Sequence, residues 1–152
     1  MQHETGGRDG HMTNPMISPT RLNAGLTILR LIVGSIFIVH GAQKLFTIGL
    51  GNIGGMMAQS GIPMGEVVGP VVALTEFLGG IALVLGLFTR LSALGLALVM
   101  AGAVFLVHFP AGFFNPRGFE FPLALLGATI AIAIMGPGNI SMDRAMKVRS
   151  QQ

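Results

Sequence analysis

One short stretch of the chain places polar, ionisable groups at the end of an apolar run. In IFIVHGAQKLF, residues 36–46, His40 and Lys44 are four residues apart and Gln43 lies three residues after His40. Side chains with this spacing project from neighbouring positions on a helix. An imidazole and an ammonium group placed together in this way can donate hydrogen bonds and exchange protons.

Matching polar groups interrupt the later apolar segments. Glu76 is the only charged residue in segment 67–88, and His108 and Glu120 lie near segment ends. At about 1.5 Å rise per residue, Glu76 lies roughly 14 Å and His40 roughly 9 Å inside the outer boundary of a membrane. A charge at the bilayer centre costs about 2.5–3.5 kcal/mol or more, so such groups are functional candidates. We expect a buried network made up of His40, Gln43, Lys44, Glu76 and Glu120.

The residue types suggest separate roles within this network. Glu76, His40 and Lys44 form the candidate catalytic site, in which Glu76 exchanges protons and Lys44 or His40 donates hydrogen bonds. The candidate substrate-binding residues around them are Gln43, Glu120 and His108. The alternative is that Glu76 pairs with Lys44 or His40 only to fix the packing of the two segments that carry them.

The composition places these groups in a membrane. The chain of 152 residues is 51% hydrophobic and 10% charged, whereas soluble domains carry about 25% charged residues. The net charge of +3 comes from basic residues at the ends of apolar segments, a pattern that predicts no nucleic-acid partner. There is no Cys, so the chain cannot build a thiol relay or a thiolate metal site.

Four apolar segments match or approach the roughly 20 residues that cross a hydrocarbon core of about 30 Å. They predict an all-α, integral membrane four-helix bundle of up-down topology, with helices at residues 22–46, 67–88, 91–109 and 121–136. Two further features are expected on the outer side. These are a short helix around residues 56–60 and a lid formed by residues 110–118.

The polar ends of the chain indicate the domain limits and the orientation. We interpret residues 1–20 as a disordered cytoplasmic tail, 21–140 as the transmembrane domain and 141–152 as a basic cytoplasmic tail. Translation can begin at Met1, Met12 or Met16. One side of the membrane collects Arg8, Arg21, Arg90, Arg144, Lys147 and Arg149, and the other collects Lys44 and Arg117. The positive-inside rule then puts both termini in the cytoplasm, at a bacterial inner membrane.

Two arginines of the cytoplasmic half, Arg30 and Arg90, are expected to have structural or headgroup-binding roles. Arg30 lies within an apolar segment, so we expect its long side chain to snorkel outward to the interface.

A series of motifs resembles the DoxX family of small bacterial four-helix membrane proteins. In order along the chain they are RLIVGSIFIVHGAQKLF, SGIP, TEFLGGIALVLGLFTRLSALGL, NPRGFEFPLALL and GPGNISMD. The resemblance covers about residues 25–143, and its recurrent polar positions match Arg30, His40, Gln43, Lys44, Glu76, Arg90 and Glu120. It implies an association with thiosulfate–quinone oxidoreduction, with resistance to quinones and catechols, or with thiol-redox complexes. The lack of Cys argues against a direct thiol role.

Three functions remain open. The first is a membrane subunit of a redox or quinone-linked detoxification system, an oxidoreductase subunit that need not be catalytic on its own. The second is a small-molecule or proton transporter, which with four helices would need a homo-oligomer. The third is a non-catalytic partner that assembles or stabilises another membrane or redox protein. The residues fix no cofactor, and quinone is the candidate. Haem is disfavoured because only His40 and His108 could ligate it and nothing else marks a haem pocket.

Overall fold

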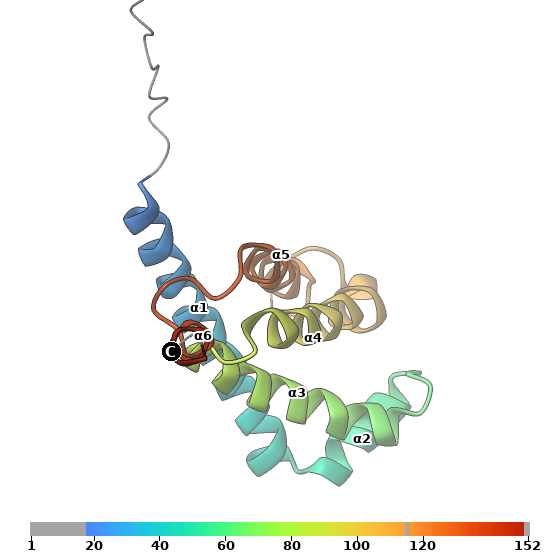
Figure 1. Ribbon diagram of the computed structural model, residues 1–152. Helices are drawn as coiled ribbons and strands as arrows, with labels where there is room; N and C mark the ends of the chain where they lie inside the picture. The colour runs from blue at the N-terminus through green and yellow to red at the C-terminus, as the bar shows by residue number, and fades with distance from the viewer. Residues whose placement is uncertain (1–17, 115, 151–152) are drawn as a thin grey trace, which may run out of the picture.

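A computed structural model describes residues 18–114 and 116–150, and the regular structure within these ranges is helical throughout. Four longer helices dominate the fold (Figure 1): α1 (Pro19–Ala42), α3 (Gly65–Leu85), α4 (Thr89–Gly102) and α5 (Glu120–Met135). Helix α1 continues into a π-helix, η1 (Gln43–Ile48), and α4 continues into a second π-helix, η2 (Ala103–His108), and a 3-10 turn, η3 (Phe109–Ala111). Two short helices, α2 (Leu50–Gln59) and α6 (Met142–Arg149), complete the described chain.

Three helical stretches of the described chain are long and apolar enough to cross a membrane. They are Pro19–Ile48, Gly65–Leu85 and Thr89–Ala111, while Glu120–Met135 is an apolar helix of fewer residues. Each of the four predicted segments therefore corresponds to a helix, and three of these reach the length of a span. Large apolar side chains remain exposed on their outer surfaces, as expected where lipid takes the place of water.

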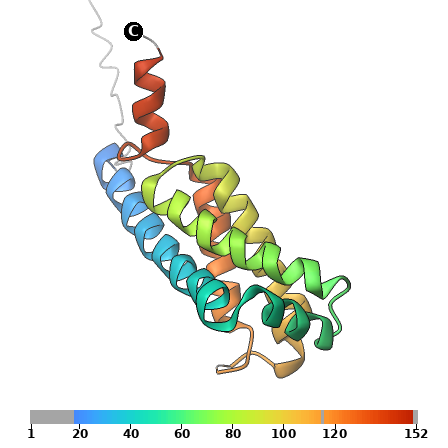
Figure 2. The ribbon, with the colours of Figure 1, turned by 90° about the horizontal axis from the view of Figure 1, so that it is seen from below.

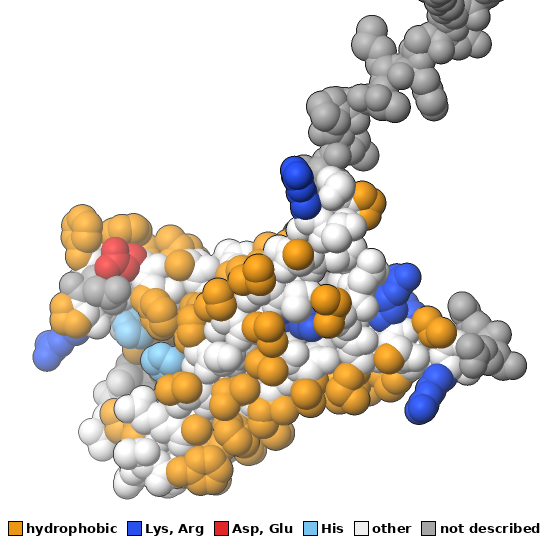
Figure 3. Space-filling view, turned by 90° about the vertical axis from the view of Figure 1, so that its left-hand side faces the viewer, with side chains coloured by type: hydrophobic (Ala, Val, Ile, Leu, Met, Phe, Trp, Pro, Cys, Tyr) orange, Lys and Arg blue, Asp and Glu red, His pale blue; other side chains and the backbone are white. Residues whose placement is uncertain are grey.

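The helices run alternately up and down, and both ends of the described chain lie at the same end of the bundle (Figure 2). Helix α1 packs mainly on α3, and α4 packs mainly on α5. Apolar side chains cover the middle of the face in Figure 3, and basic side chains gather toward the end that carries the chain ends.

Glycines allow α1 and α3 to approach closely. A Cβ added at Gly41 would lie 2.4 Å from the backbone nitrogen of Phe77, and one added at Gly34 would lie 2.8 Å from the carbonyl oxygen of Gly80. Any larger residue at these positions would push the helices apart. Small residues at such crossings are typical of membrane helix packing.

A packed apolar core joins the helices next to this crossing. Its most deeply buried large side chains are Phe37, Leu83, Leu96 and Ile132, each no more than 1% exposed. These residues come from α1, α3, α4 and α5. The core therefore fixes the relative positions of all four helices.

The structure adds detail to three expectations about the short helix and the two terminal segments. The short helix expected around residues 56–60 begins earlier, at Leu50, and packs along the start of α3. The predicted basic tail at 141–152 contains a helix, α6, which is capped by Ser141. The predicted tail at 1–20 lies outside the described residues except for 18–20, where Ser18 caps α1 and the helix begins at Pro19.

Candidate functional site

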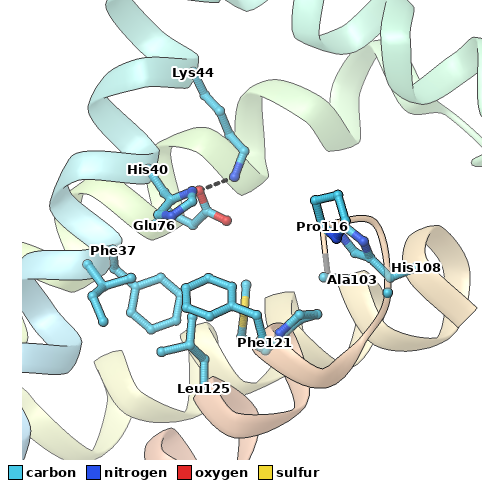
Figure 4. A pocket seen from close by; sticks show the side chains of 13 residues that line it. Phe37, His40, Lys44, Glu76, Ala103, His108, Pro116, Phe121 and Leu125 are labelled. Atoms are coloured by element: carbon cyan, nitrogen blue, oxygen red, sulfur yellow. Dashed lines mark hydrogen bonds and ion pairs between the residues drawn. The ribbon is translucent and has the colours of Figure 1, made fainter. Parts of the chain in front are cut away.

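An ion pair between Lys44 and Glu76 joins the C-terminal end of the first span to the middle of α3 (Figure 4). The Glu76 side chain is 3% exposed and the Lys44 side chain is 21% exposed. A buried carboxylate is tolerated only when it is paired and hydrogen-bonded. The partly open ammonium group of Lys44 therefore neutralises a carboxylate that has almost no contact with solvent.

The backbone brings these two side chains together. Gly41 lies three residues before Lys44 and lets α1 touch the backbone of Phe77, the residue after Glu76. Lys44 itself lies in the π-helix η1, and its carbonyl oxygen accepts a 3.0 Å bond from the Gly49 amide five residues later. Single π-turns of this kind are frequent at functional sites.

A first cavity of about 340 Å³ lies beside the ion pair, toward α5 (Figure 4). Its polar lining consists of His40, Lys44, Glu76 and His108. The imidazole of His40 lies against the Phe121 ring, with 5.9 Å between the ring centroids. The cavity thus combines these four polar side chains with the aromatic rings of Phe37 and Phe121.

His108 lies on the far wall of this first cavity, on the π-helix η2. Its Nδ1 is 2.8 Å from the carbonyl oxygen of Arg117. Because a carbonyl can only accept, Nδ1 is assigned as the donor, which leaves Nε2 as the second polar atom of the ring. The 110–118 segment also contributes Pro116 and Gly118 to the lining, so this loop covers part of the cavity.

A second cavity of about 430 Å³ lies on the other side of the ion pair, among α2, α3, α4 and η2. Lys44, Glu76 and His108 line this cavity as well, together with Ala103. The rest of its lining is almost entirely apolar: Ile53, Met56, Met57, Ile62, Val68, Val72, Leu98, Val99, Leu106 and Val107, with Ser60 and Gly102. The ion pair therefore lies between a cavity of mixed polar and apolar lining and a cavity whose lining is mostly apolar.

The predicted five-residue network is only partly assembled. Lys44 and Glu76 are paired, and His40 lines the cavity beside them but is exposed and not buried as predicted. Gln43 is exposed and lines neither cavity, so its predicted place in the buried network is wrong. Glu120 begins α5, is half-buried and also lines neither cavity. Phe121 and Ala103 line the site but carry no ionisable group that would have marked them in the sequence.

Arg30 is buried, 3% exposed, and does not reach outward as expected. Its guanidinium donates to the carbonyl oxygens of Pro137 and Ile140, the second at 2.6 Å. The snorkelling interpretation is therefore wrong. The residue acts as a clamp on the loop after α5, and the Asn139 amide adds a 2.9 Å bond to the Asn23 side chain in α1.

The same end of the bundle is closed by Asp143 from α6. Its carboxylate accepts hydrogen bonds from the amides of Phe88, at 2.7 Å, and Thr89, at 2.9 Å, which cap the first turn of α4. Burial opposes its ionisation, but the bonds from Thr89 and Phe88 and the nearby Arg30 guanidinium outweigh burial and hold the pKa of Asp143 below its ordinary value. Arg90, by contrast, is exposed at the start of α4.

Within residues 18–114 and 116–150, no cluster of three or more His, Cys, Asp or Glu side chains is arranged to hold a metal ion. The polar groups of the site are thus an ammonium group, a carboxylate and two imidazoles. This set suits hydrogen bonding to a carbonyl or hydroxyl group and the transfer of protons.

The helices and the site define a small multi-span membrane protein with a polar site at one end of its bundle. A family model described as DoxX matches residues 25–109. The Escherichia coli "Inner membrane protein YqjF" is 33% identical over 126 residues, which cover 82% of this chain and 93% of the relative. The chain belongs to the DoxX family.

Two other relatives have similar coverage. The Bacillus subtilis protein named "Putative oxidoreductase CatD" is 31% identical over 119 residues, or 78% of this chain and 84% of the relative. The Mycobacterium tuberculosis "Uncharacterized membrane protein Rv3486" is 31% identical over 134 residues, or 80% of this chain and 81% of the relative. No solved structure matches the chain.

Proposed function

We propose that this protein is a membrane subunit of a redox or quinone-linked detoxification system, and that it binds a quinone-like ring beside Lys44 and Glu76. The observation that carries the proposal is the buried ion pair at the meeting of two cavities. Volumes of about 340 and 430 Å³ lie within the range of small-molecule sites, roughly 300–1,000 Å³. The relative named as a putative oxidoreductase agrees with a redox role.

The polar groups fit the chemistry of a quinone. The Lys44 ammonium has three N–H bonds and Glu76 accepts one of them, so two remain to donate to a ring carbonyl oxygen. Reduction of a quinone to a quinol consumes two electrons and two protons. In this proposal Glu76 and His40 pass protons to the ring oxygens, while a partner redox protein supplies the electrons.

The apolar core favours a binding site over a path through the membrane. Phe37, Leu83 and Leu96 are no more than 1% exposed, and the clamp formed by Arg30 closes the end near the termini. Both cavities lie on the other side of this core. Water and protons can reach the ion pair from that side, whereas a transporter would need an opening through tightly packed side chains.

We also infer that the four-helix bundle is embedded in a bacterial inner membrane with the site toward the outer face. Among the described residues, Arg21, Arg90, Arg144, Lys147 and Arg149 belong to the end that carries the chain ends, and Lys44 and Arg117 to the other. Cytoplasmic termini satisfy the positive-inside rule. Tags at the two termini that reacted with an impermeant reagent in intact cells would contradict this orientation.

Purification in mild detergent tests the binding function. The protein is examined by optical spectroscopy, extracted with organic solvent, and then titrated with a naphthoquinone. We expect bound quinone in the extract or saturable binding of the added compound. A preparation that is free of quinone and also fails to bind the naphthoquinone would overturn the proposal.

Two carboxylate variants distinguish a role of Glu76 in proton exchange from a role in helix packing. Glu76→Gln keeps the size and the hydrogen-bonding capacity of the side chain but cannot exchange a proton, whereas Glu66→Gln alters an exposed carboxylate on the same helix. In cells challenged with a quinone, we expect Glu66→Gln to protect as well as the wild type and Glu76→Gln to lose protection. Full protection by Glu76→Gln would assign Glu76 to helix packing and favour a non-catalytic partner role.

A further inference from the structure

The apolar cavity has no evident use if the ligand is only a polar ring. It is lined on one side by α2 and α3, including Met57 and Val72, and on the other by α4 and η2. Its outer rim carries Leu98 and Leu106, which are 75% and 60% exposed. In a membrane these side chains face hydrocarbon, so the cavity opens sideways to the lipid.

The packing of α3 against α4 explains why this opening exists. A Cβ added at Gly79 would lie 3.1 Å from the Leu96 side chain, so the two helices touch near their connection. They diverge toward α2, as Figure 1 shows. Beyond the contact, Val72 and Val99 line opposite walls of the second cavity.

The two cavities share four lining residues: Lys44, Glu76, Ala103 and His108. Ala103 has the smallest side chain of the four, and Lys44 has the most flexible one. The border between the cavities is thus formed by the Lys44–Glu76 ion pair, the His108 imidazole and the Ala103 methyl group, and Ala103 leaves the most room of the four. The first cavity adds His40 and the aromatic ring of Phe121 to the shared residues, so a larger part of its lining is polar or aromatic than in the second cavity (Figure 4).

We propose that the two cavities form one bipartite site for a lipid-soluble ligand with a ring head and an apolar chain. The ring occupies the first cavity beside Lys44 and Glu76. The chain passes Ala103, fills the second cavity and leaves between α3 and α4 into the bilayer. This inference rests on the proposed function and adds to it the class of ligand and its route of entry.

In this proposal the second cavity gives the apolar chain room to fit and adds little to the binding free energy. Lipid is as apolar as the cavity lining, so a chain that moves from one to the other gains little. What the cavity provides is a continuous apolar exit for the chain while the ring contacts charged groups. Blocking this exit should exclude a chain-bearing ligand and spare a ring-only ligand.

Gly102 offers a suitable position for such a block. It lines the second cavity, and a Cβ added there meets no atom within 4 Å. Gly102→Phe can therefore place a ring in the opening without a backbone clash. Gly127→Phe is the matched control, because Gly127 also has open space around an added Cβ but lies exposed on α5, away from both cavities.

The experiment titrates detergent-purified protein with 2-methyl-1,4-naphthoquinone and with the same ring carrying a ten-carbon alkyl chain. We expect the wild type and Gly127→Phe to bind both. We expect Gly102→Phe to bind the ring-only compound within about twofold of the wild type and the chain-bearing compound at least tenfold more weakly. Val72→Phe, on the opposite wall, should show the same selectivity and guards against a folding defect peculiar to residue 102.

The outcomes separate the two proposals. If both block variants bind the chain-bearing compound as the wild type does, or weaken both compounds equally, the bipartite site is overturned while ring binding stands. If the wild type binds neither compound, both proposals are overturned.

Discussion

The Glu76 carboxylate, nearly completely buried in α3, is paired with the Lys44 ammonium group from the π-helical end of the first span. The two residues are 32 positions apart in the chain. The pair holds η1 and α3 together and also supplies polar groups to both cavities. Its structural and binding contributions can be separated by changing the partners singly and together.

Lys44→Met should destabilise the protein by about 3–5 kcal/mol, because it leaves a buried carboxylate without its partner. The double variant Lys44→Met/Glu76→Gln removes both charges and should regain most of that loss. Chemical unfolding in detergent, followed by circular dichroism, measures the difference. A double variant as unstable as Lys44→Met would show that the pair is not the main cause of the loss.

Gly41→Ala should destabilise the protein even though Ala is the better helix former. The added methyl group would lie 2.4 Å from the Phe77 backbone nitrogen, and overpacking of this kind typically costs about 1–3 kcal/mol. Gly25→Ala, on the same helix but with open space around an added Cβ, should be neutral or stabilising by up to about 1 kcal/mol. Thermal melts in detergent that ranked the two variants equally would argue against the close α1–α3 contact.

Arg30→Gln should lower stability and leave ligand binding by the folded protein unchanged, because Arg30 lies at the end of the bundle away from the cavities. Each bond from a charged donor contributes about 1.5–3 kcal/mol, and two carbonyl bonds are lost. Arg30→Lys keeps the charge but lacks the planar fork that reaches both carbonyls, so it should rescue stability only in part. Complete rescue by Lys in thermal unfolding would instead support a simple snorkelling cation.

Asp143→Ala should destabilise α4 and α6 at neutral pH, by about 0.5–2 kcal/mol for the lost cap. Because the folded pKa of Asp143 lies below its unfolded value, its stabilisation is complete above the unfolded pKa and is lost as the pH falls through the folded pKa. The difference in melting temperature between wild type and variant should therefore be constant near neutral pH and shrink below about pH 4. A difference that persisted unchanged to strongly acidic pH would contradict this role of the carboxylate.

Much of the helix arrangement and part of the site could be predicted from the sequence. Apolar runs placed the four main helical stretches, Pro19–Ile48, Gly65–Leu85, Thr89–Ala111 and Glu120–Met135, within about three residues of their observed bounds, because a lipid-facing helix must satisfy its own backbone hydrogen bonds. The cost of a buried charge also made a partner for Glu76 predictable, and Lys44 is that partner.

Other features depend on geometry that the residue pattern does not contain. The residue pattern puts His40, Gln43 and Lys44 on neighbouring helix positions but does not show which side of the helix meets α3. Gly41 makes that contact with Phe77, and Gln43, two residues later at about 100° per residue, lies on the other side of the helix and is exposed. Arg30 bonds to carbonyl groups 107 and 110 residues later. Only the folded loop after α5 brings those carbonyls within reach, so the sequence alone favoured an outward-reaching arginine.

The binding of a quinone ring at the Lys44–Glu76 pair is tested most directly by titrating 2-methyl-1,4-naphthoquinone into three purified proteins: the wild type, Lys44→Met/Glu76→Gln and Lys147→Met. Lys147 is an exposed cation on α6, far from both cavities. We predict saturable binding by the wild type and by Lys147→Met with the same affinity. The folded double variant should bind at least about tenfold more weakly, because a bond from a charged donor contributes about 1.5–3 kcal/mol. Equal affinities in all three proteins, or the absence of saturable binding in the wild type, would contradict the site.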